Sequence, residues 1–391
     1  MDCIVAEKTG TAIQKAIDET TAKGGGRVVL EAGTYLSGTI HLKSNIELHL
    51  SPGAVILGAP QWDAYEDFDD PGLNEVVPEK SRKCLIACQN SENVSITGSG
   101  EINGQGLEFF DKNVPDGIFV KPDFPRPRMV QFFNCRNVTV DGCSFVDSPN
   151  WTFWFTACSE VRVSRIRVET DPRILNSDGI DIDGCSRVTV SDSFFNTGDD
   201  CLILRAIRRK QDIPAICEQV AVTNCVLNSH CQGIRLGCPS DDTIRNCSFS
   251  NIIFKGGGNG IHGIQSFRYL RKNCNGYLRM SDIAFRNFDI TTGQHPIRVG
   301  CEDGLRLRGM ERLTFEDFRI QGEKPIIFFG NAETVLKNIS LCDFTGTING
   351  NVPIELKYVN GLNLRNVTLD AAKGEPVPFV RQPGESWETK F

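Results

Sequence analysis

The sequence predicts an all-β fold: a parallel β-helix, in which coils of short strands stack on one another, with a short N-terminal helix. Two observations predict it. A four-residue strand pattern recurs, mostly at spacings of about 23–30 residues, and the chain between the copies lacks helical periodicity. This spacing is too short for a propeller blade, and the missing helices exclude βαβ units. We therefore expect one domain over residues 1–391, with an N-terminal cap over about residues 1–30.

The individual elements follow from this pattern in order. Thr11–Ala22 is an amphipathic run and is expected to be the helix of the cap. Each later coil begins with a polar residue or glycine, followed by aliphatic or aromatic residues in alternation, which indicates a strand with one buried face. The copies are Asn45–Leu48, Asn93–Ile96, Asn137–Val140, Glu160–Val163, Arg187–Val190, Gln219–Val222, Asp282–Phe285, Arg312–Phe315, Asn338–Leu341 and Gly361–Leu364, with a weaker copy at Arg245–Phe249. Asn93 and Asn137 also begin glycosylation sequons, but their recurrence with the coil indicates turn positions.

Composition and charge narrow the class of protein. A net charge of −7 and a pI near 5.4 argue against nucleic acid as a partner, and no apolar run reaches membrane-spanning length. No secretory signal is visible, so we expect a cytoplasmic protein of bacterial type. The 16 cysteines are scattered through strand-like segments and are expected to be buried free thiols. No cofactor and no metal is predicted, and the oligomeric state is open.

Aspartates are concentrated in two segments one coil apart, Asn176–Asp183 and Asn196–Cys201. Asp178 and Asp200 are 22 residues apart, so stacked coils are expected to bring Asp178, Asp199 and Asp200 to one surface. Clustered carboxylates repel one another, so one is expected to be protonated near neutral pH while the others stay ionised. This combination suits acid–base cleavage of a glycosidic bond. The alternatives are a calcium site and turn aspartates that cap backbone amides.

Asn176-Ser-Asp-Gly-Ile-Asp, followed by Gly198-Asp-Asp-Cys, resembles the motifs of glycoside hydrolase family 28, the polygalacturonase-like family. An upstream segment, Gly98-Ser-Gly-Glu-Ile-Asn-Gly-Gln-Gly106, resembles the same family, and the similarity extends over roughly residues 8–370. The resemblance implies a right-handed parallel β-helix and an inverting hydrolase that uses a single displacement.

The resemblance also implies roles for individual residues. Asp199 matches the general acid. Asp178 and Asp200 match the pair that positions and deprotonates the attacking water. Asn176, which begins the first motif, is a candidate for substrate binding.

One departure from the family concerns a histidine that precedes the next conserved strand. Register through Gly233 and Gly237 puts Gln232 at this position, with His230 two residues earlier. Either Gln232 replaces the histidine as a neutral hydrogen-bonding group, or a bulge brings His230 into the site. Both residues are therefore candidates for substrate binding.

A second departure concerns the substrate. Polygalacturonases carry an Arg-x-Lys pair that grips the galacturonate carboxylate, and the matching positions here hold His262 and Ile264. This predicts a terminal sugar other than galacturonate, with His262 as a candidate contact. The other substrate-binding candidates on or after these coils are Arg205, Arg235, Gln265, Arg268, Arg271 and Arg298.

Aromatic residues and a long loop complete the candidate site. Trp151 lies one coil before Asp178, and alternation puts Trp151 and Trp154 on opposite faces of a strand. One of them is expected to be a platform for a sugar ring, the alternative being a stack inside the solenoid. Lys112–Arg128, rich in Pro and Asp, is expected to be a loop that walls the substrate groove.

These observations predict a glycoside hydrolase for an oligosaccharide from pectin or another plant or gut glycan, exo-acting on a non-galacturonate terminal sugar. The alternatives are an exo-polygalacturonase and a non-catalytic carbohydrate-binding β-helix. A β-helix lyase is disfavoured, because lyases need a basic residue beside the uronate and no lysine lies near the aspartates.

Overall fold

The computed structural model describes residues 2–68, 81–111, 113, 120, 125–209, 215–237, 239–270 and 278–372. These residues belong to two compact units. The first unit comprises Met1–Asp199 with Arg209–Ile213, and the second comprises Asp200–Arg208 with Pro214–Phe391. The assignment of residues 1–391 to one catalytic domain with a cap over about residues 1–30 stays a prediction. Most of the predicted loop Lys112–Arg128, and also Arg271, lie outside the described residues.

The described part of the first unit contains one α-helix, two 3-10 helices and short strands. The helices are α1 (Gly10–Ala22), η1 (Trp62–Ala64) and η2 (Gly106–Phe109). The strands are β1 (Asp2–Ile4), β2 (Gly26–Leu30), β3 (Gly33–Ser37), β4 (Ile40–Leu42), β5 (Ile46–Leu50), β6 (Ala54–Gly58), β7 (Cys84–Gln89), β8 (Glu92–Gly98), β9 (Glu101–Asn103), β10 (Arg128–Phe133), β11 (Arg136–Asp141), β12 (Ser144–Val146), β13 (Phe153–Thr156), β14 (Ser159–Ser164), β15 (Arg167–Glu169), β16 (Ile180–Asp183), β17 (Ser186–Ser191) and β18 (Phe194–Thr197).

The second unit continues with longer strands. They are β19 (Leu202–Arg205), β20 (Cys217–Ser229), β21 (Gln232–Leu236), β22 (Thr243–Gly256), β23 (Asn259–Gln265), β24 (Arg279–Thr292), β25 (Ile297–Cys301), β26 (Gly309–Gly322), β27 (Ile326–Phe329), β28 (Leu336–Ile348), β29 (Ile354–Lys357) and β30 (Val359–Ala371). One 3-10 helix, η3 (Phe267–Tyr269), follows β23. Within the described residues, no helix is long and apolar enough to cross a membrane.

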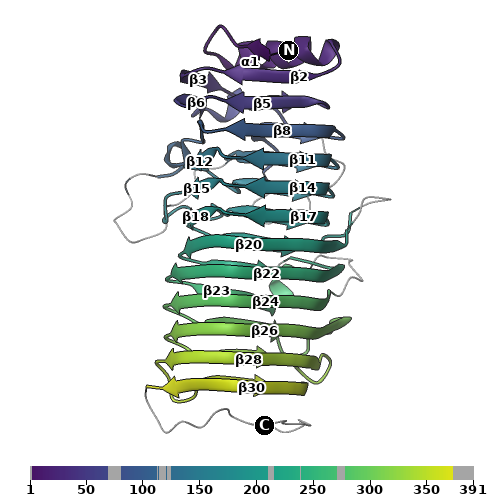
Figure 1. Cartoon of the computed structure of the whole chain (residues 1–391), viewed down its shortest axis with the longest axis vertical. Helices are drawn as coiled ribbons and strands as arrows, with labels where there is room; N and C mark the ends of the chain where they lie inside the picture. The colour runs from purple at the N-terminus through teal and green to yellow at the C-terminus, as the bar shows by residue number, and fades with distance from the viewer. Residues whose placement is uncertain are drawn as a thin grey trace. The chain divides into compact units, whose positions relative to one another are not determined.

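Each unit pairs its strands in parallel, as expected for a β-helix. In the first unit, the A sheet contains the rows β2–β5–β8–β11–β14–β17 and β3–β6–β9–β12–β15–β18, and the B sheet contains β4–β7–β10–β13–β16. In the second unit, the A sheet is β20–β22–β24–β26–β28–β30 and the B sheet is β19–β21–β23–β25–β27–β29. Figure 1 shows the A-sheet strands of each unit as parallel rows.

The repeated aliphatic residues occupy equivalent positions on successive coils. In the first unit, Val138 pairs with Val94 on one side and with Val161 on the other, and all three are buried. Leu313 pairs in the same way with Ile283 in the second unit. The predicted strand pattern is thereby confirmed, because one buried side chain per coil builds a continuous apolar core.

The predicted helix is also confirmed, with one more residue at its N-terminus. Oγ1 of Thr9 caps α1 by accepting a 3.2 Å hydrogen bond from the backbone N–H of Ala12. The side chains of Ile13 and Ile17 are fully buried, one turn apart on the same face of α1. The helix therefore closes the N-terminal end of the first unit's core.

The cysteines among the described residues are free thiols, as predicted from their positions in strands. Of the cysteines within the described residues, Cys3 and Cys231 are partly exposed and the rest are buried. Sγ of Cys135 donates a 3.7 Å hydrogen bond to Sγ of Cys88, and the two thiols form no disulfide. The buried thiols therefore fill space in the core as small apolar side chains.

Candidate active site

Asp178 lies at the start of a B-sheet strand in the first unit. It lies two residues before the first residue of β16, and its side chain is buried. Its carbonyl accepts a 2.9 Å hydrogen bond from the N–H of Thr152, and the carbonyl of Gly179 accepts one from Phe153. The position of Asp178 is therefore fixed by backbone pairing with the preceding coil.

Asp199 follows β18 and is held by the turn that carries Asp178. Oδ2 of Asp199 accepts a 2.9 Å hydrogen bond from the backbone N–H of Asn176. The carbonyl of Asp199 accepts a second bond, of 2.6 Å, from Oγ1 of Thr197. Side chain and backbone of Asp199 are thus both tethered, while the residue remains partly exposed. The first unit therefore brings together Asn176 and Asp199, a contact that the sequence analysis did not predict.

Gly198 allows the segment that carries Asp199 to pack closely against the turn at Asn176. The N–H of Gly198 donates to Oγ1 of Thr170 and to Oγ of Ser177, at 3.1 Å each. A Cβ on Gly198 would lie 2.6 Å from the carbonyl oxygen of Ile174 and from Oγ of Ser177. Only glycine fits between Asp199 and its support without displacing backbone.

A buried arginine that sequence analysis missed supports the same turn. Nη2 of Arg126 donates a 2.8 Å hydrogen bond to Oδ1 of Asn176, and Nη1 donates to the carbonyls of Pro149 and Leu175. The guanidinium also lies 5.2 Å from the ring centre of Phe110. No repeat or motif marks Arg126, so only the three-dimensional contacts reveal its role.

The two tryptophans pack together inside the first unit. Trp151 and Trp154 are 1% and 0% exposed, and their rings meet edge to face with centroids 5.4 Å apart. The guanidinium of Arg128 lies over both rings. Alternation predicted opposite faces, which is wrong, because Trp151 precedes β13 and does not follow strand geometry. Burial of both rings argues against a sugar platform, although Trp154 alternates with the stacked core residues Phe153 and Phe155 and so lies on the opposite face of β13.

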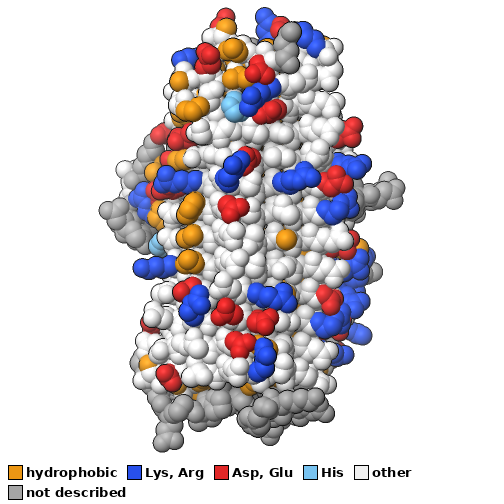
Figure 2. Space-filling model, in the orientation of Figure 1, with side chains coloured by type: hydrophobic (Ala, Val, Ile, Leu, Met, Phe, Trp, Pro, Cys, Tyr) orange, Lys and Arg blue, Asp and Glu red, His pale blue; other side chains and the backbone are white. Residues whose placement is uncertain are grey.

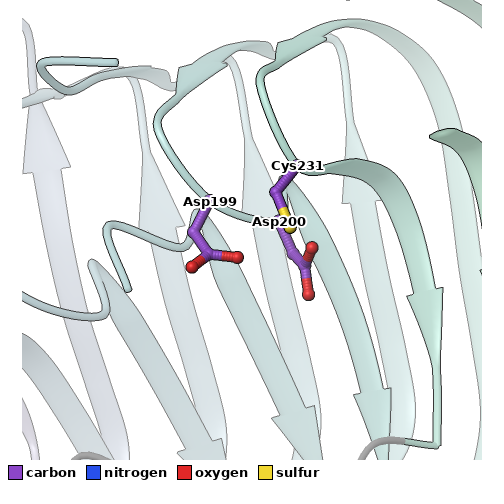
Figure 3. A group of neighbouring side chains, drawn as sticks. All are labelled: Asp199, Asp200 and Cys231. Carbon is purple, nitrogen blue, oxygen red and sulfur yellow. The ribbon is translucent and has the colours of Figure 1, made fainter. Parts of the chain in front are cut away.

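Asp200 opens the second unit and faces an arginine. Oδ2 of Asp200 lies 3.5 Å from Nη1 of Arg235, and both side chains are largely buried. Cys231 is close by, with Sγ within 4.8 Å of an Asp200 carboxylate oxygen. Figure 3 shows the Cys231 and Asp200 side chains, with Asp199 as the preceding residue. The candidate Arg235 therefore lies with one of the predicted catalytic carboxylates.

Gln232 belongs to a chain of buried polar side chains in the second unit. Its Oε1 accepts a 2.6 Å hydrogen bond from Nδ2 of Asn259, which also lies 3.4 Å from Nδ1 of His262. His230, by contrast, is exposed in the turn between β20 and β21. Of the two candidates for the position, the structure places Gln232 with His262 and leaves His230 outside.

His262 is a neutral imidazole in this setting. Burial, followed by the nearby charges of Arg235 and Arg298, lowers the pKa of His262 to about 3. Since the amide nitrogen of Asn259 can only donate, Nδ1 of His262 accepts and Nε2 carries the proton. His262 is thus a hydrogen-bond donor at Nε2 rather than a cation.

Three further substrate-binding candidates, Gln265, Arg268 and Arg205, differ in burial and in their contacts. Nε2 of Gln265 donates to the backbone carbonyls of Leu236 and Gly263, so this amide fastens β21 to β23. Arg268 is exposed on η3, 5.1 Å from the ring centre of Tyr269. The buried Arg205 ends β19.

Tyr269 was not a sequence candidate. The guanidinium of Arg235 lies 5.6 Å from its ring centre, so Arg235 and Arg268 both contact Tyr269. Because Tyr269 lies in η3, outside the repeated strand pattern, no feature of the sequence marks it as a site residue.

Comparison with known proteins shows the family to which the chain belongs. A model of the glycosyl hydrolases of family 28 matches residues 71–342. An endo-polygalacturonase of Pectobacterium carotovorum is 25% identical over 354 residues, covering 85% of this chain and 83% of the relative. Exopolygalacturonase B of Aspergillus niger is 25% identical over 296 residues, covering 71% of this chain and 61% of the relative.

A solved structure matches the fold. The exopolygalacturonase of Thermotoga maritima superposes with a TM-score of 0.71 at 21% identity, covering 95% of this chain and 92% of that chain. The right-handed parallel β-helix expected from the sequence is thereby confirmed.

Proposed function

Because the chain belongs to glycosyl hydrolase family 28, we propose that it hydrolyses, with inversion, a glycosidic bond in an oligosaccharide derived from pectin or another plant or gut glycan. The hydrogen bond from the Asn176 N–H to Asp199 carries this proposal. By this contact the first acidic motif directly orients a carboxylate of the second.

The proposed reaction gives Asp199 the part of general acid. The N–H of Asn176 occupies Oδ2, so Oδ1 carries the proton that passes to the leaving glycosidic oxygen. One carboxylate of the pair Asp178 and Asp200 accepts a proton from water, and the other helps to position that water. The water oxygen bonds to the anomeric carbon from the opposite face as the bond to the protonated leaving oxygen breaks, in a single displacement. The free sugar then leaves with its anomeric configuration inverted.

The proposed mode is exo-cleavage of a terminal sugar other than galacturonate. The support is that His262 and Ile264 stand where family polygalacturonases carry their Arg-x-Lys pair. The second candidate is an exo-polygalacturonase, which is favoured by the similarity to exopolygalacturonase B.

A hydrolysis screen tests the proposed function. Wild type and Asp199→Asn are assayed on aryl glycosides and pectic oligosaccharides, with NMR recording the anomer that appears first. We expect release of terminal sugars with inversion, and a loss of at least about a thousandfold in the variant. Asp317→Asn is the control, because Asp317 has a φ of 57°, which asparagine also tolerates. Equal rates in wild type and Asp199→Asn would refute the role of Asp199, and binding without turnover would favour the non-catalytic alternative.

A further inference from the structure

Three residues with basic side chains occupy equivalent positions on three consecutive B-sheet strands of the second unit. Arg235 in β21 pairs with His262 in β23, and His262 pairs with Arg298 in β25. Ile261 and Ile297, which precede His262 and Arg298, are fully buried core residues. Because side chains alternate along a strand, the three residues lie on the face opposite to the core, about 4.8 Å apart from rung to rung.

Within this row, Arg235 faces the carboxylate of Asp200, whereas the positive charge of Arg298 is poorly compensated by the described residues. Burial and the charge of Arg235 lower the pKa of Arg298 from its ordinary value. Arg298 makes no ion pair with any described residue, and its buried Nε has no hydrogen-bond partner among them. His262 between the two guanidiniums is neutral, so it adds no charge of its own. A half-buried guanidinium in this situation costs stability unless an anion joins it.

In contrast to Arg298, arginines of the A sheet in the same unit have acidic partners on adjacent strands. Arg279 donates to Glu311 at 2.8 Å, and Arg286 donates to Glu316 at 3.2 Å, in each case on the adjacent strand. Figure 2 shows basic and acidic side chains side by side over the A sheet. Each of these arginines has an acidic partner one rung away, and Arg298 pairs instead with the apolar Ile327. The unpaired state of Arg298 is therefore not the general pattern of this surface.

We propose that Arg298, with Arg235 beside it, binds a carboxylate of the substrate, and that Nε2–H of His262 donates a hydrogen bond to the same group. This deepens the proposed function, on which it rests, by making the bound sugar acidic. The residues differ from the Arg-x-Lys positions: those hold His262 and Ile264, and the cations lie on the strands to either side. A planar guanidinium suits a carboxylate, since two N–H donors match its two oxygens. The acidic sugar replaces the neutral one expected from the loss of Arg-x-Lys.

Binding experiments on the full chain test the carboxylate site without requiring turnover. The background is Asp199→Asn, and the probes are digalacturonate, a disaccharide with terminal glucuronate, and the methyl esters of both. Calorimetric titration compares this background with the added substitutions Arg298→Gln, Arg298→Lys and, as a control, Arg286→Gln on the A sheet. Removal of Arg298 relieves repulsion, so we expect Arg298→Gln to fold with a melting temperature at or above that of its parent.

The expected result is selectivity for charge that depends on Arg298. At least one acid binds about tenfold to a hundredfold more tightly than its ester. Arg298→Gln removes that preference while ester binding stays the same, Arg298→Lys retains part of it, and Arg286→Gln retains all of it. Which acid shows the preference distinguishes a galacturonate from a glucuronate substrate.

Three results would overturn the proposal: esters that bind as well as the acids, an acid preference that survives in Arg298→Gln, or no binding of either acid at millimolar concentration. A charge preference that depends on Arg298, in a protein whose wild type hydrolyses nothing, would uphold the carboxylate site and refute the hydrolase. The two proposals therefore fail separately.

Discussion

The backbone N–H of Asn176 donates a 2.9 Å hydrogen bond to Oδ2 of Asp199, across 23 residues of sequence. Asn176 has a φ of 57°, a left-handed conformation that asparagine tolerates better than most residues. The turn can therefore aim its N–H at the carboxylate while the Asn176 side chain accepts from Arg126. We therefore expect the orientation of the proposed acid to depend on Arg126, which contacts Asn176 and the carbonyls of Pro149 and Leu175.

Arg126→Met is expected to lower kcat while leaving KM almost unchanged. The substitution leaves the carbonyls of Pro149 and Leu175 without their donor, so the turn at Asn176 loses its support. We expect the free energy of unfolding to fall by about 3 kcal/mol and kcat to fall tenfold to a hundredfold. Urea denaturation and steady-state kinetics, both well below the melting temperature, measure the two effects.

Arg162→Met is the matched control for this prediction. Arg162 also donates to an asparagine side chain, Oδ1 of Asn137, but it is exposed on the A sheet. Its replacement should leave kcat within twofold. Arg126→Lys should recover part of the lost kcat. A normal kcat in a folded Arg126→Met protein would show that Asp199 does not need this support.

Gly198→Ala is expected to displace Asp199. The added Cβ would meet the carbonyl oxygen of Ile174 and Oγ of Ser177 at 2.6 Å, and the backbone carbonyl cannot move aside cheaply. We expect a loss of about 1–3 kcal/mol in stability and a larger proportional loss in kcat. Gly257→Ala serves for comparison, because nothing lies within 4 Å of its Cβ position. Similar melting temperatures and rates for the two variants would contradict the steric account.

The fold was predictable because the repeat is a physical requirement of the core. A residue such as Val138 must match its neighbours one coil away, and this leaves a periodic signal in the sequence. The recurring asparagines behave in the same way: Nδ2 of Asn93 donates to Oδ1 of Asn45, and Nδ2 of Asn137 donates to Asn93, at 2.8 Å each. All three asparagines have positive φ, but Asn93 and Asn137, which begin sequons, are the second residues of β8 and β11 and do not lie in separate turns.

The supporting residues of the site were not predictable, because their contacts are not periodic. Arg126 reaches partners 23, 49 and 50 residues away, and no spacing rule connects them. Tyr269 lies on η3, outside the repeat, and is recognised only through its contacts with two arginines. The alternation rule does not apply to Trp151, because the strand begins two residues later, at Phe153.

Trp151→Ala is expected to act on stability rather than on substrate affinity. The ring is buried against Trp154 and beneath Arg128, so its removal leaves a cavity in the core of the first unit. We expect a loss of about 3–5 kcal/mol in the free energy of unfolding. Trp62→Ala, at a partly exposed tryptophan, should lose less. A stable Trp151→Ala protein with KM raised tenfold or more would instead restore the sugar platform expected from the sequence.

Replacement of His262 is expected to reduce the loss of stability in acid. Its pKa is about 3 in the folded chain against an ordinary 6.5, because the imidazole is buried beside Arg235 and Arg298, with His295 also near. Above pH 6.5 neither state binds a proton there, so stability does not change with pH through this group. Between pH 6.5 and 3 the unfolded chain takes up the proton and the folded chain does not. Stability is therefore lost as pH falls through this window, by up to about 1.4 kcal/mol per pH unit.

Urea denaturation of wild type and His262→Gln at pH 7, 5.5 and 4.5 measures this difference. The glutamine can still accept from Asn259, so we expect similar stability at pH 7 and a growing advantage for the variant at lower pH. His230→Gln, at an exposed position, should follow the wild type throughout. Parallel stability curves for wild type and His262→Gln would mean that the imidazole is already charged in the folded state. It would then add a third cation to the row formed by Arg235 and Arg298.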